Sequence, residues 1–363
     1  MAKKNVLILI TSYWPQIGGA EIAVREITKR LGADFNFVIL TIRHSRSFLK
    51  SEQIGGVQVY RLGLGCRWDQ YFYPVLAFVK SFFIDFDLVY AVSASYAGLA
   101  ALLINHFRGK EYVLNLQSGT LDSAQKRKKV GLLGPLYKQI HLRASKIHAI
   151  SNALKERAER LGVAVDRIVV IPNGVALDEF KNFFGRRDAC QLVAVARLET
   201  VKGIEYLIKA MPLIIAKEPR VSLAIAGDGS QRMSLEKLVV ELGVADRVSF
   251  LGSLERRRVV ELMNSGSVFV CPSLAEGFGI VCVEAMACGL AVVGANVGGI
   301  PDIIKHGVNG FLVKSANVEQ IVDAVAYLLE NPLSRERLAA NALTTIEQYN
   351  WNKISQKVSC LFV

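Results

Sequence analysis

Glutamate and glycine residues lie close together in one stretch of the sequence, at a spacing that suits a bound sugar or phosphate. The stretch runs Glu276-Gly277-Phe278-Gly279-Ile280 and continues to Glu284, about two helical turns after Glu276. It follows an apolar run and opens a helical pattern, so free backbone N–H groups there would attract a phosphate or a sugar hydroxyl. The carboxylate of Glu284 would accept hydrogen bonds from the two hydroxyls of a ribose. The spacing alone leaves a second interpretation open, in which Glu276 only caps the helix and Glu284 is solvated.

Two cations form the second candidate cluster. Arg197 ends an apolar run, and Lys202 opens the next helical pattern. A planar guanidinium and a compact ammonium five residues apart suit a diphosphate. Taken alone, the pair is equally compatible with two surface cations.

A double glycine, Gly18-Gly19, lies in Trp14–Glu21, between the first apolar run and the first helical pattern. Consecutive backbone N–H groups in such a turn can bind an anion. The stretch does not read G-x-G-x-x-G, so the dinucleotide-binding fingerprint is absent. An ordinary turn between a strand and a helix is the alternative.

The elements that must position these residues follow from the hydrophobic pattern. Apolar runs of four to seven residues alternate with amphipathic stretches, which is typical of parallel strands buried on both faces between helices. The predicted strands are 5–11, 35–41, 57–61, 88–92, 112–116, 146–150, 168–171, 191–196, 221–226, 248–251, 267–271 and 291–294. The predicted helices include 20–31, 95–107, 204–217, 233–242, 259–264, 280–288, 318–330, 333–348 and 351–361.

The pattern stops at Pro172–Ala189, which has the composition of a linker, and then restarts. We therefore predict an α/β fold with two Rossmann-like domains that face each other across a cleft, residues 1–175 and 190–348. Ligands should bind at the carboxyl ends of the strands. A helix at about 350–363 is expected to return to the N-terminal domain.

Length and composition agree with this organisation. The chain has 363 residues, 52% hydrophobic and 21% charged, which excludes a disordered protein and allows two full cores. Six cysteines form no CxxC pair, so buried free thiols in a reducing cytosol are expected. No signal peptide or transmembrane span is evident, and we expect a cytoplasmic protein.

The positive charge is concentrated in the first half. Residues 1–180 hold 24 Lys and Arg against 14 Asp and Glu, whereas residues 181–363 hold 20 against 18. The excess suggests docking on an anionic membrane surface or a polyprenyl-diphosphate acceptor, with Lys126–Lys129 as the expected contact, and a merely solvated surface is the alternative. Apolar insertion is expected from Trp68, Tyr71, Phe72 and Tyr73. Nucleic acid is not expected, because no aromatic–basic binding signature is present.

Taken together, these motifs resemble the retaining GT-B glycosyltransferases of family 4, and the resemblance runs from end to end. The motifs that carry it, in chain order, are Gly18-Gly19, Ser151-Asn152, Ile171–Val175, Arg197 with Lys202-Gly203, Gly227–Gly229, Phe250–Gly252, Glu276 to Glu284, Gly298–Pro301 and Asn309–Val313.

The resemblance implies a role for each site residue. Arg197 and Lys202 would hold the diphosphate of a nucleotide sugar and stabilise it as it leaves, and Glu276 would contact the hydroxyls of the donor sugar. These three are the predicted catalytic residues. The predicted donor-binding residues are Gly18, Gly19, Gln117, Gly227, Gly252, Phe278, Gly279, Ile280 and Glu284, with Glu284 on the ribose.

Gln117 departs from the family pattern. Many members carry a histidine at this position, after the strand 112–116, where it helps to bind the donor sugar. Glutamine can hydrogen-bond a sugar hydroxyl but cannot titrate. The five histidines of the chain lie outside the motifs and are expected to be structural or on the surface.

The resemblance implies transfer of a hexosyl group, with retention, from a UDP- or GDP-sugar to a glycan or lipid-linked acceptor. No cofactor and no metal are expected, on the premise that the chain lacks an Asp-x-Asp motif. Two rival functions remain: a GT-B epimerase of UDP-sugars, and a catalytically degenerate binding subunit, for which Gln117 is the best argument. The protein is expected at the inner face of the membrane.

Overall fold

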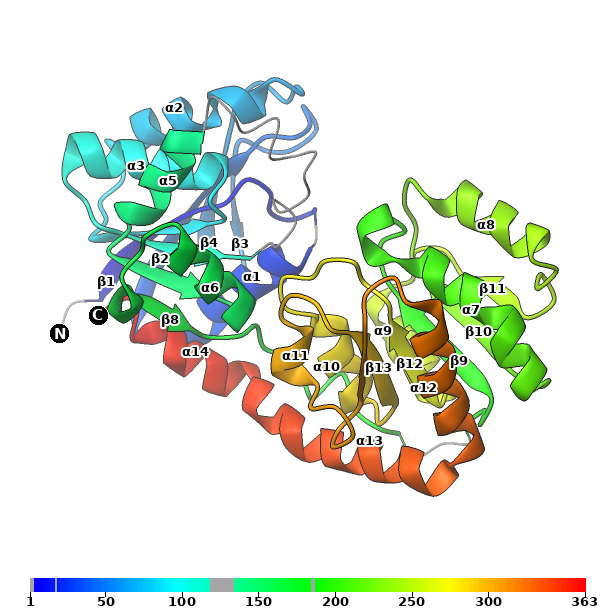
Figure 1. Cartoon of the computed structure of the whole chain (residues 1–363). Coiled ribbons are helices and arrows are strands. Elements are labelled where there is room, and N and C mark those ends of the chain that lie inside the picture. Colours follow the sequence, from blue (N-terminus) through cyan, green and yellow to red (C-terminus); the bar gives the residue numbers. More distant parts are fainter. Residues whose placement is uncertain (1–2, 17, 118–133, 184–186) are drawn as a thin grey trace. The chain divides into compact units, whose positions relative to one another are not determined.

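The computed structural model describes residues 3–16, 18–117, 134–183 and 187–363 (Figure 1). The chain divides into two compact units. The N-terminal unit comprises Met1–Gly174 together with Trp351–Val363, and the C-terminal unit comprises Val175–Asn350.

The N-terminal unit is built on one eight-stranded sheet with the order β3-β4-β2-β1-β5-β6-β7-β8. All neighbours are parallel except β3, which pairs antiparallel with β4 at the edge. The central strands β1 and β5 are almost continuously buried, as expected for strands covered on both faces. The strands are β1 Lys4–Leu9, β2 Phe35–Ile42, β3 Ser51–Ile54, β4 Val57–Leu62, β5 Leu88–Val92, β6 Tyr112–Leu116, β7 Lys146–Ala149 and β8 Ile168–Val170.

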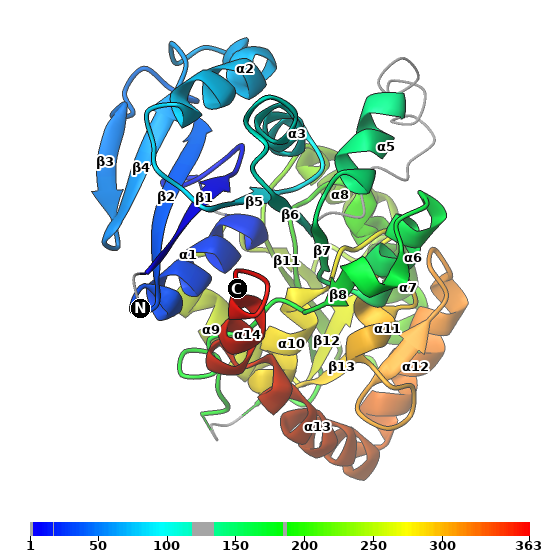
Figure 2. The same cartoon turned by 90° about the vertical axis from the view of Figure 1, so that its left-hand side faces the viewer.

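Helices cover both faces of this sheet (Figures 1 and 2). Helix α1 packs beside α14, while α2, α3 and α5 pack in sequence against one another. The helix α14 follows residue 350 and belongs to this unit, as predicted, and the ring of Phe362 beyond it contacts Phe35, Phe37 and Tyr90. The helices are α1 Gly19–Leu31, α2 Asp69–Ser81, α3 Tyr96–Arg108, α5 Gly134–Leu142, α6 Asn152–Arg160 and α14 Trp351–Ser359.

The C-terminal unit contains a six-stranded parallel sheet with the order β11-β10-β9-β12-β13-β14. Its core lies between this sheet and the apolar sides of α7, α8 and α12. The strands are β9 Gln191–Val195, β10 Ser222–Ala226, β11 Val248–Phe250, β12 Val268–Cys271, β13 Ala291–Ala295 and β14 Phe311–Val313. The helices are α7 Ile204–Lys217, α8 Arg232–Glu241, α9 Arg256–Ser265, α10 Ile280–Ala287, α11 Ile300–Ile303, α12 Val318–Glu330 and α13 Pro332–Ile346.

The two α/β units with parallel sheets confirm the predicted fold class. Among the described strands and α-helices, six have no counterpart in the predicted ranges: β3, β14, α2, α5, α6 and α11. β3 is a short, half-exposed edge strand, and β14 has only three residues. α2 was missed because it is apolar on both sides and carries Pro74, so the periodicity that marks a helix is weak.

Side-chain burial corrects two smaller expectations. Cys190, Cys271, Cys282 and Cys288 are buried free thiols as predicted, but Cys360 is exposed and Cys66 is half-buried. Tyr73 is completely buried and donates its hydroxyl to the carbonyl of Leu40 at 2.8 Å, so the prediction that it inserts into a membrane is wrong. In the described part of the chain no helix has both the length and the apolar character of a membrane span.

Candidate active site

The predicted catalytic residues lie at the carboxyl edge of the C-terminal sheet, on both sides of its centre. The chain leaves β9 toward β10 on one side, whereas β12 pairs with β9 on the other. The strand order therefore reverses between β9 and β12, and ligands of open α/β sheets bind at such a switch point. Arg197 follows β9, and Glu276 follows β12.

Lys202 and Glu276 meet at this switch point. Lys202 ends a short 3₁₀ turn, Thr200–Lys202, and its Nζ lies 2.6 Å from Oε2 of Glu276. The two backbones are tied nearby, because the N–H of Leu274 donates to the carbonyl of Val201 at 2.8 Å. Both side chains are mostly buried, which strengthens the electrostatic attraction between them.

Gly298 fixes the backbone that carries Glu276. Its φ is +56°, and a Cβ there would lie 1.7 Å from the carbonyl oxygen of Glu276. Only glycine therefore fits at this position. The motif was recognised in the sequence but given no role, although a double glycine after a buried strand is itself a signal of close backbone approach.

A second close approach links the ends of β9 and β10. Gly227 has a φ of +134°, and a Cβ there would lie 1.8 Å from the carbonyl oxygen of Ala196. Its N–H donates to the carbonyl of Gly252 at 2.7 Å. The structure thus brings the two predicted nucleotide-pocket glycines together, directly beside the residue that precedes Arg197.

Arg197 itself is exposed. Its neighbour Glu199 accepts hydrogen bonds from the hydroxyl and the N–H of Ser230. These bonds, and to a smaller extent the charge of Arg197, hold the pKa of Glu199 below its usual value. Because Arg197 is exposed, its guanidinium is accessible to a ligand at the edge of the sheet.

Glu276 does not cap α10, so the capping interpretation of its role is wrong. The N-cap residue is Gly279, whose missing side chain leaves the N–H groups of Ile280 and Val281 without a side-chain cap, while the N–H of Cys282 donates to the carbonyl of Gly279 at 2.9 Å. Ile280 begins the helix. Phe278 is buried with its ring 5.5 Å from that of Tyr349, so it can offer a ligand only its backbone.

Glu284 lies in the second half of α10 and is half-buried, not solvated. Desolvation raises the pKa of its carboxyl to about 7. The charges that act on it most are those of Arg256, which lowers the pKa, and Glu179, which raises it. Arg256 and Glu179 also form an ion pair with each other.

In the N-terminal unit, the double glycine lies at the start of α1. Gly18 is the N-cap residue in an extended conformation, and its carbonyl accepts the N–H of Ile22 at 3.0 Å. Gly19 is the first helical residue, and a side chain there would meet nothing within 4 Å. The backbone at this position is therefore open to a ligand.

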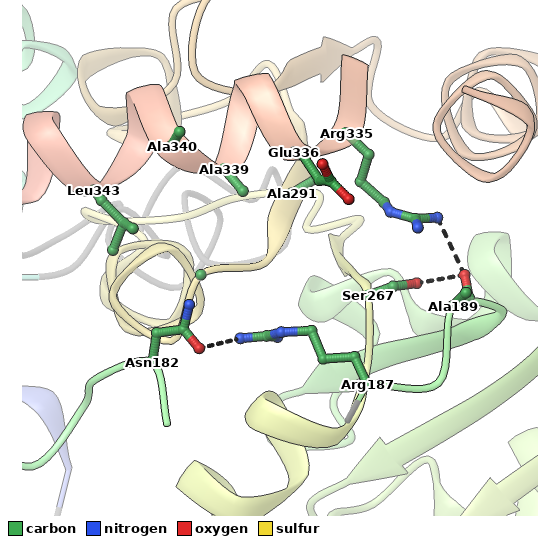
Figure 3. A pocket seen from close by; sticks show the side chains of 11 residues that line it. Asn182, Arg187, Ala189, Ser267, Ala291, Arg335, Glu336, Ala339, Ala340 and Leu343 are labelled. Atoms are coloured by element: carbon green, nitrogen blue, oxygen red, sulfur yellow. Dashed lines mark hydrogen bonds between the residues drawn. The ribbon is translucent and has the colours of Figure 1, made fainter. Parts of the chain in front are cut away.

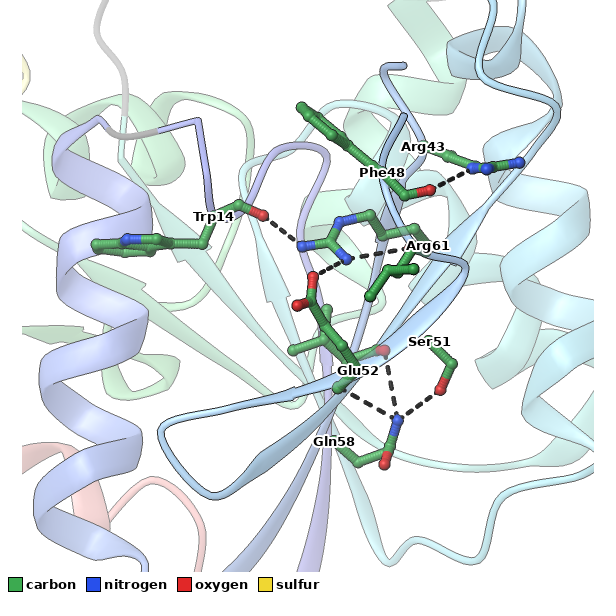
Figure 4. A network of polar contacts seen from close by, with 9 residues as sticks. Trp14, Arg43, Phe48, Ser51, Glu52, Gln58 and Arg61 are labelled. Atoms are coloured by element: carbon green, nitrogen blue, oxygen red, sulfur yellow. Dashed lines mark hydrogen bonds and ion pairs between the residues drawn. The ribbon is translucent and has the colours of Figure 1, made fainter. Parts of the chain in front are cut away.

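A buried arginine anchors the loop that leads to this double glycine (Figure 4). Arg61 on β4 donates to the carbonyl of Trp14 and pairs with Glu52 on β3. It also donates to the carbonyl of Leu49 at 3.1 Å. This network could not be predicted from the sequence, because Arg61 lies 47 residues from Trp14.

Gln117 is held by two asparagines at the carboxyl end of β6. Its Nε2 donates to Oδ1 of Asn115 at 2.7 Å, and its Oε1 accepts from Nδ2 of Asn173 at 3.0 Å. Both asparagines are buried. Asn173 belongs to the Pro172-Asn173-Gly174 motif, for which the sequence had suggested no function.

The predicted basic contact cannot be located in the structure, and one premise about metal binding is wrong. Lys126–Lys129 lie outside the described residues. The premise that the chain lacks an Asp-x-Asp motif is wrong, because Asp85-Phe86-Asp87 is one. It stands at the amino end of β5, where both carboxylates accept hydrogen bonds from Asn5. Among the described residues no cluster of His, Cys, Asp and Glu could hold a metal ion.

A cavity of about 370 Å³ in the C-terminal unit lies at the opposite edge of the sheet (Figure 3). Ala189, Ser267 and Ala291 line it, and these residues stand at the amino ends of β9, β12 and β13. Arg187 crosses its floor to Asn182 and binds the carbonyls of Gly266 and Cys288. None of the predicted site residues lines this cavity, which therefore has a structural arginine at its base and no part in the candidate site.

Family models match both halves of the chain. Residues 17–179 match the model described as Glycosyltransferase Family 4, and residues 178–345 match Glycosyl transferases group 1. The chain belongs to glycosyltransferase family 4. An uncharacterized glycosyltransferase from Methanocaldococcus jannaschii is 37% identical over 254 residues, which cover 63% of this chain and 65% of that protein.

A second curated relative of this glycosyltransferase chain is the phosphatidylinositol N-acetylglucosaminyltransferase gpi3 subunit of Schizosaccharomyces pombe. It is 30% identical over 199 residues, or 54% of this chain and 43% of that protein. The chain spans between 40% and 65% of the length of the curated relatives it matches.

Solved structures confirm the fold over nearly the whole chain. Sucrose-phosphate synthase from Thermosynechococcus elongatus superimposes with a TM-score of 0.87 at 21% identity, covering 99% of this chain and 98% of that one. Anabaena HepE in complex with UDP-glucose gives a TM-score of 0.80 at 22% identity, with 98% of each chain covered. The architecture is that of the GT-B glycosyltransferases.

Proposed function

We propose that the protein is a retaining hexosyltransferase that uses a nucleotide-diphosphate sugar, UDP- or GDP-linked, as its donor. The observation that carries the proposal is the contact between Lys202 and Glu276 at the switch point of the C-terminal sheet, where Arg197 follows β9. A cation, a carboxylate and an exposed guanidinium at one sheet edge can hold the diphosphate and the hydroxyls of such a donor.

The proposed chemistry is departure of the diphosphate from the anomeric carbon. Negative charge then develops on the diphosphate oxygens, and Arg197 and Lys202 would neutralise it. Preorganised cations in a site of low water content can lower a barrier by several kcal/mol. Glu276 would orient the donor sugar, and the free N–H groups at the start of α10 would bind its hydroxyls or phosphate. No metal is part of this proposal.

For the nucleotide, we propose that Glu284 binds the ribose hydroxyls and that Gly227 and Gly252 border the base. Gly18, Gly19 and Gln117 would contribute from the N-terminal unit. UDP-glucose is the first donor to test, because HepE, with the same fold, is solved with it bound.

A glycan or lipid-linked acceptor is proposed for the second substrate. The S. pombe relative is named a phosphatidylinositol N-acetylglucosaminyltransferase subunit, and phosphatidylinositol is a membrane lipid. The excess of positive charge in residues 1–180 fits an acceptor at an anionic membrane, so we place the protein at the cytoplasmic face of a membrane.

The two rival functions make different predictions. A UDP-sugar epimerase would convert its substrate without any acceptor. A degenerate binding subunit would bind a nucleotide sugar but never cleave it, and Gln117 in place of the usual histidine is the specific observation that favours this rival.

A thermal-shift screen of UDP-, GDP- and ADP-sugars, followed by assay of donor hydrolysis, tests the proposal. A donor at about 100 times its Kd should add about 2.7 kcal/mol to the unfolding free energy. Hydrolysis should release the hexose first as the anomer that the donor carries. Stabilisation without hydrolysis would favour the binding subunit, and an epimerised nucleotide sugar would favour the epimerase.

A further inference from the structure

Helix α2 of the N-terminal unit is apolar on the side that faces solvent. Tyr73, Ala77 and Ser81 form its buried stripe against the sheet and α3. Within Asp69–Ser81, every exposed position carries an aromatic or aliphatic side chain. These positions are Tyr71, Phe72, Val75, Leu76 and Val79. A helix that is apolar on both sides is normally buried in a protein or in a lipid phase.

The apolar face continues beyond both ends of the helix. Trp68 precedes α2 and is 56% exposed, and Phe82 and Phe83 follow it, Phe83 with 78% of its surface exposed. The Trp68 and Tyr71 rings lie 5.9 Å apart. We define the α2 surface as Trp68, Tyr71, Phe72, Val75, Leu76, Val79, Phe82 and Phe83.

Cations border this surface. The guanidinium of Arg67 lies 5.1 Å from the centre of the Trp68 ring, and that of Arg108 lies 4.9 Å from the Phe82 ring. Lys80, on α2 itself, has its Nζ 4.3 Å from the Tyr60 ring. The border of the α2 surface is thus positively charged at both ends.

Acidic side chains are nearly absent from this part of the sequence. From Gln53 to Ile84 the one acidic residue is Asp69. Asp69 is buried and accepts the N–H groups of Gly65 and Cys66 at 2.7 and 3.0 Å, so its charge is turned inward. The next acids, Asp85 and Asp87, are engaged by Asn5.

We propose that the α2 surface docks on an anionic lipid bilayer. Tryptophan and tyrosine prefer the boundary between lipid and water, and an apolar helix face bordered by cations is the pattern of helices that lie in this boundary. The cations would select anionic headgroups, and the apolar side chains would enter the acyl layer. The α2 surface as defined does not include Lys126–Lys129, which lie outside the described residues. Docking through this surface would bring the protein to a lipid-linked acceptor in the bilayer, and to that extent the inference rests on the proposed function.

Vesicle co-sedimentation tests the proposal on the full chain. The probes are phosphatidylcholine vesicles with and without phosphatidylglycerol. The wild type should bind the anionic vesicles, and Phe72→Ser combined with Phe83→Ser should weaken this partitioning about tenfold or more. The matched control is Met233→Ser with Leu333→Ser in the C-terminal unit, since these side chains are 80% and 83% exposed. This control should bind like the wild type.

Two further measurements separate the possible outcomes. Brominated lipids should quench the fluorescence of the wild type and quench Trp68→Phe less. Donor hydrolysis in solution should be unchanged in the α2 variant, so loss of vesicle binding can be distinguished from failure of the proposed function. The proposal is overturned if the wild type binds neither vesicle or if the α2 variant binds normally. Self-association without vesicle binding, abolished by the α2 variant, would assign the surface to a second copy of the chain instead.

Discussion

Nζ of Lys202 lies 2.6 Å from Oε2 of Glu276, so the residue predicted to bind the diphosphate forms an ion pair with the residue predicted to bind the donor sugar. A bound donor would insert its diphosphate beside Lys202 and its sugar hydroxyls beside Glu276. Each partner would then exchange an internal contact for one with the substrate.

The first prediction is that the two residues act as a unit. Lys202→Met and Glu276→Gln should each lower kcat/KM, and the double variant should lose less than the sum of the two effects. Contacting residues typically show coupling of about 0.5–3 kcal/mol. A double-mutant cycle on donor hydrolysis measures this coupling. The exposed pair Arg257 and Glu261 provides the control cycle, which should leave kcat/KM unchanged.

The second prediction concerns Arg197. Because its side chain is exposed, Arg197→Ala should leave the melting temperature within about a degree while kcat/KM falls by orders of magnitude. Each tenfold loss corresponds to about 1.4 kcal/mol of transition-state stabilisation. Arg257→Ala, another exposed arginine of the same unit, is the matched control. Normal kinetics in folded Arg197→Ala would remove Arg197 from the site.

The third prediction is a pH dependence of nucleotide binding. Glu284 has a pKa near 7, and its carboxylate is the form that accepts the ribose hydroxyls. Affinity for the nucleotide should rise with pH up to about 7 and level off above it. Binding at pH 6 should be about tenfold weaker than the plateau. Isothermal titration between pH 5.5 and 8.5 (an order-of-magnitude window around that pKa) measures this.

Glu284→Gln should flatten that profile and mainly raise KM, because a ribose contact holds the ground and transition states alike. A fall in kcat alone would place Glu284 in the chemistry instead. The stability of the wild type should depend on pH in the opposite direction. The pKa of Glu284 in the folded protein is raised above its usual value of 4.5, so the unfolding free energy should decrease as pH rises from 4.5 to about 7.

The fourth prediction concerns the amide network at the end of β6. Gln117→Ala removes the partner of Asn115 and Asn173, both buried, and should lower the unfolding free energy by about 1–3 kcal/mol. Urea denaturation gives the value. Gln117→Glu serves as the isosteric comparison: it keeps an acceptor for Asn173 but cannot donate to Asn115. It should therefore lose only part of the stability, and a loss equal to that of alanine would argue against the network.

The fifth prediction is that Arg61 stabilises the loop before the double glycine. Arg61→Met leaves Glu52 without its partner. Arg61→Met also leaves the carbonyls of Trp14 and Leu49 without their donor, and leaving a buried acceptor unpaired typically costs about 1–3 kcal/mol. Glu52 is partly exposed, so Glu52→Gln should cost less. Denaturation of both variants checks the order, and hydrogen exchange at Gly18 and Gly19 should increase in Arg61→Met.

The sequence predicted those parts of the fold in which chemistry and burial give a strong local pattern. β5 and β6 were predicted to the residue, because strands buried on both faces are continuous apolar runs. α2 gave no helical period, since its exposed face is as apolar as its buried one. The sequence predicted that Trp68, Tyr71, Phe72 and Tyr73 insert into a membrane, but only the structure separates the buried Tyr73 from the exposed Phe72.

The residues of the candidate site could be predicted from the sequence, but the contacts between them could not. Arg197 with Lys202, and Glu276 with Glu284, were candidates from their positions in the sequence, and the family resemblance assigned their roles. Their pairing could not be predicted, because Lys202 and Glu276 are 74 residues apart and meet only through the pairing of β9 with β12. The contacts of Gln117 with Asn173 and of Arg61 with Trp14 depend on strand order in the same manner.

The division of the chain into units has a consequence for biosynthesis. Val175 and Asn350 pair with each other, so the C-terminal unit is one continuous segment that begins and ends at neighbouring positions. The N-terminal unit, in contrast, needs α14 beside α1 and Phe362 among Phe35, Phe37 and Tyr90. On the ribosome, residues 1–174 emerge first but lack their last helix until residues 175–350 have been made. The unit translated first is therefore the one whose core closes last.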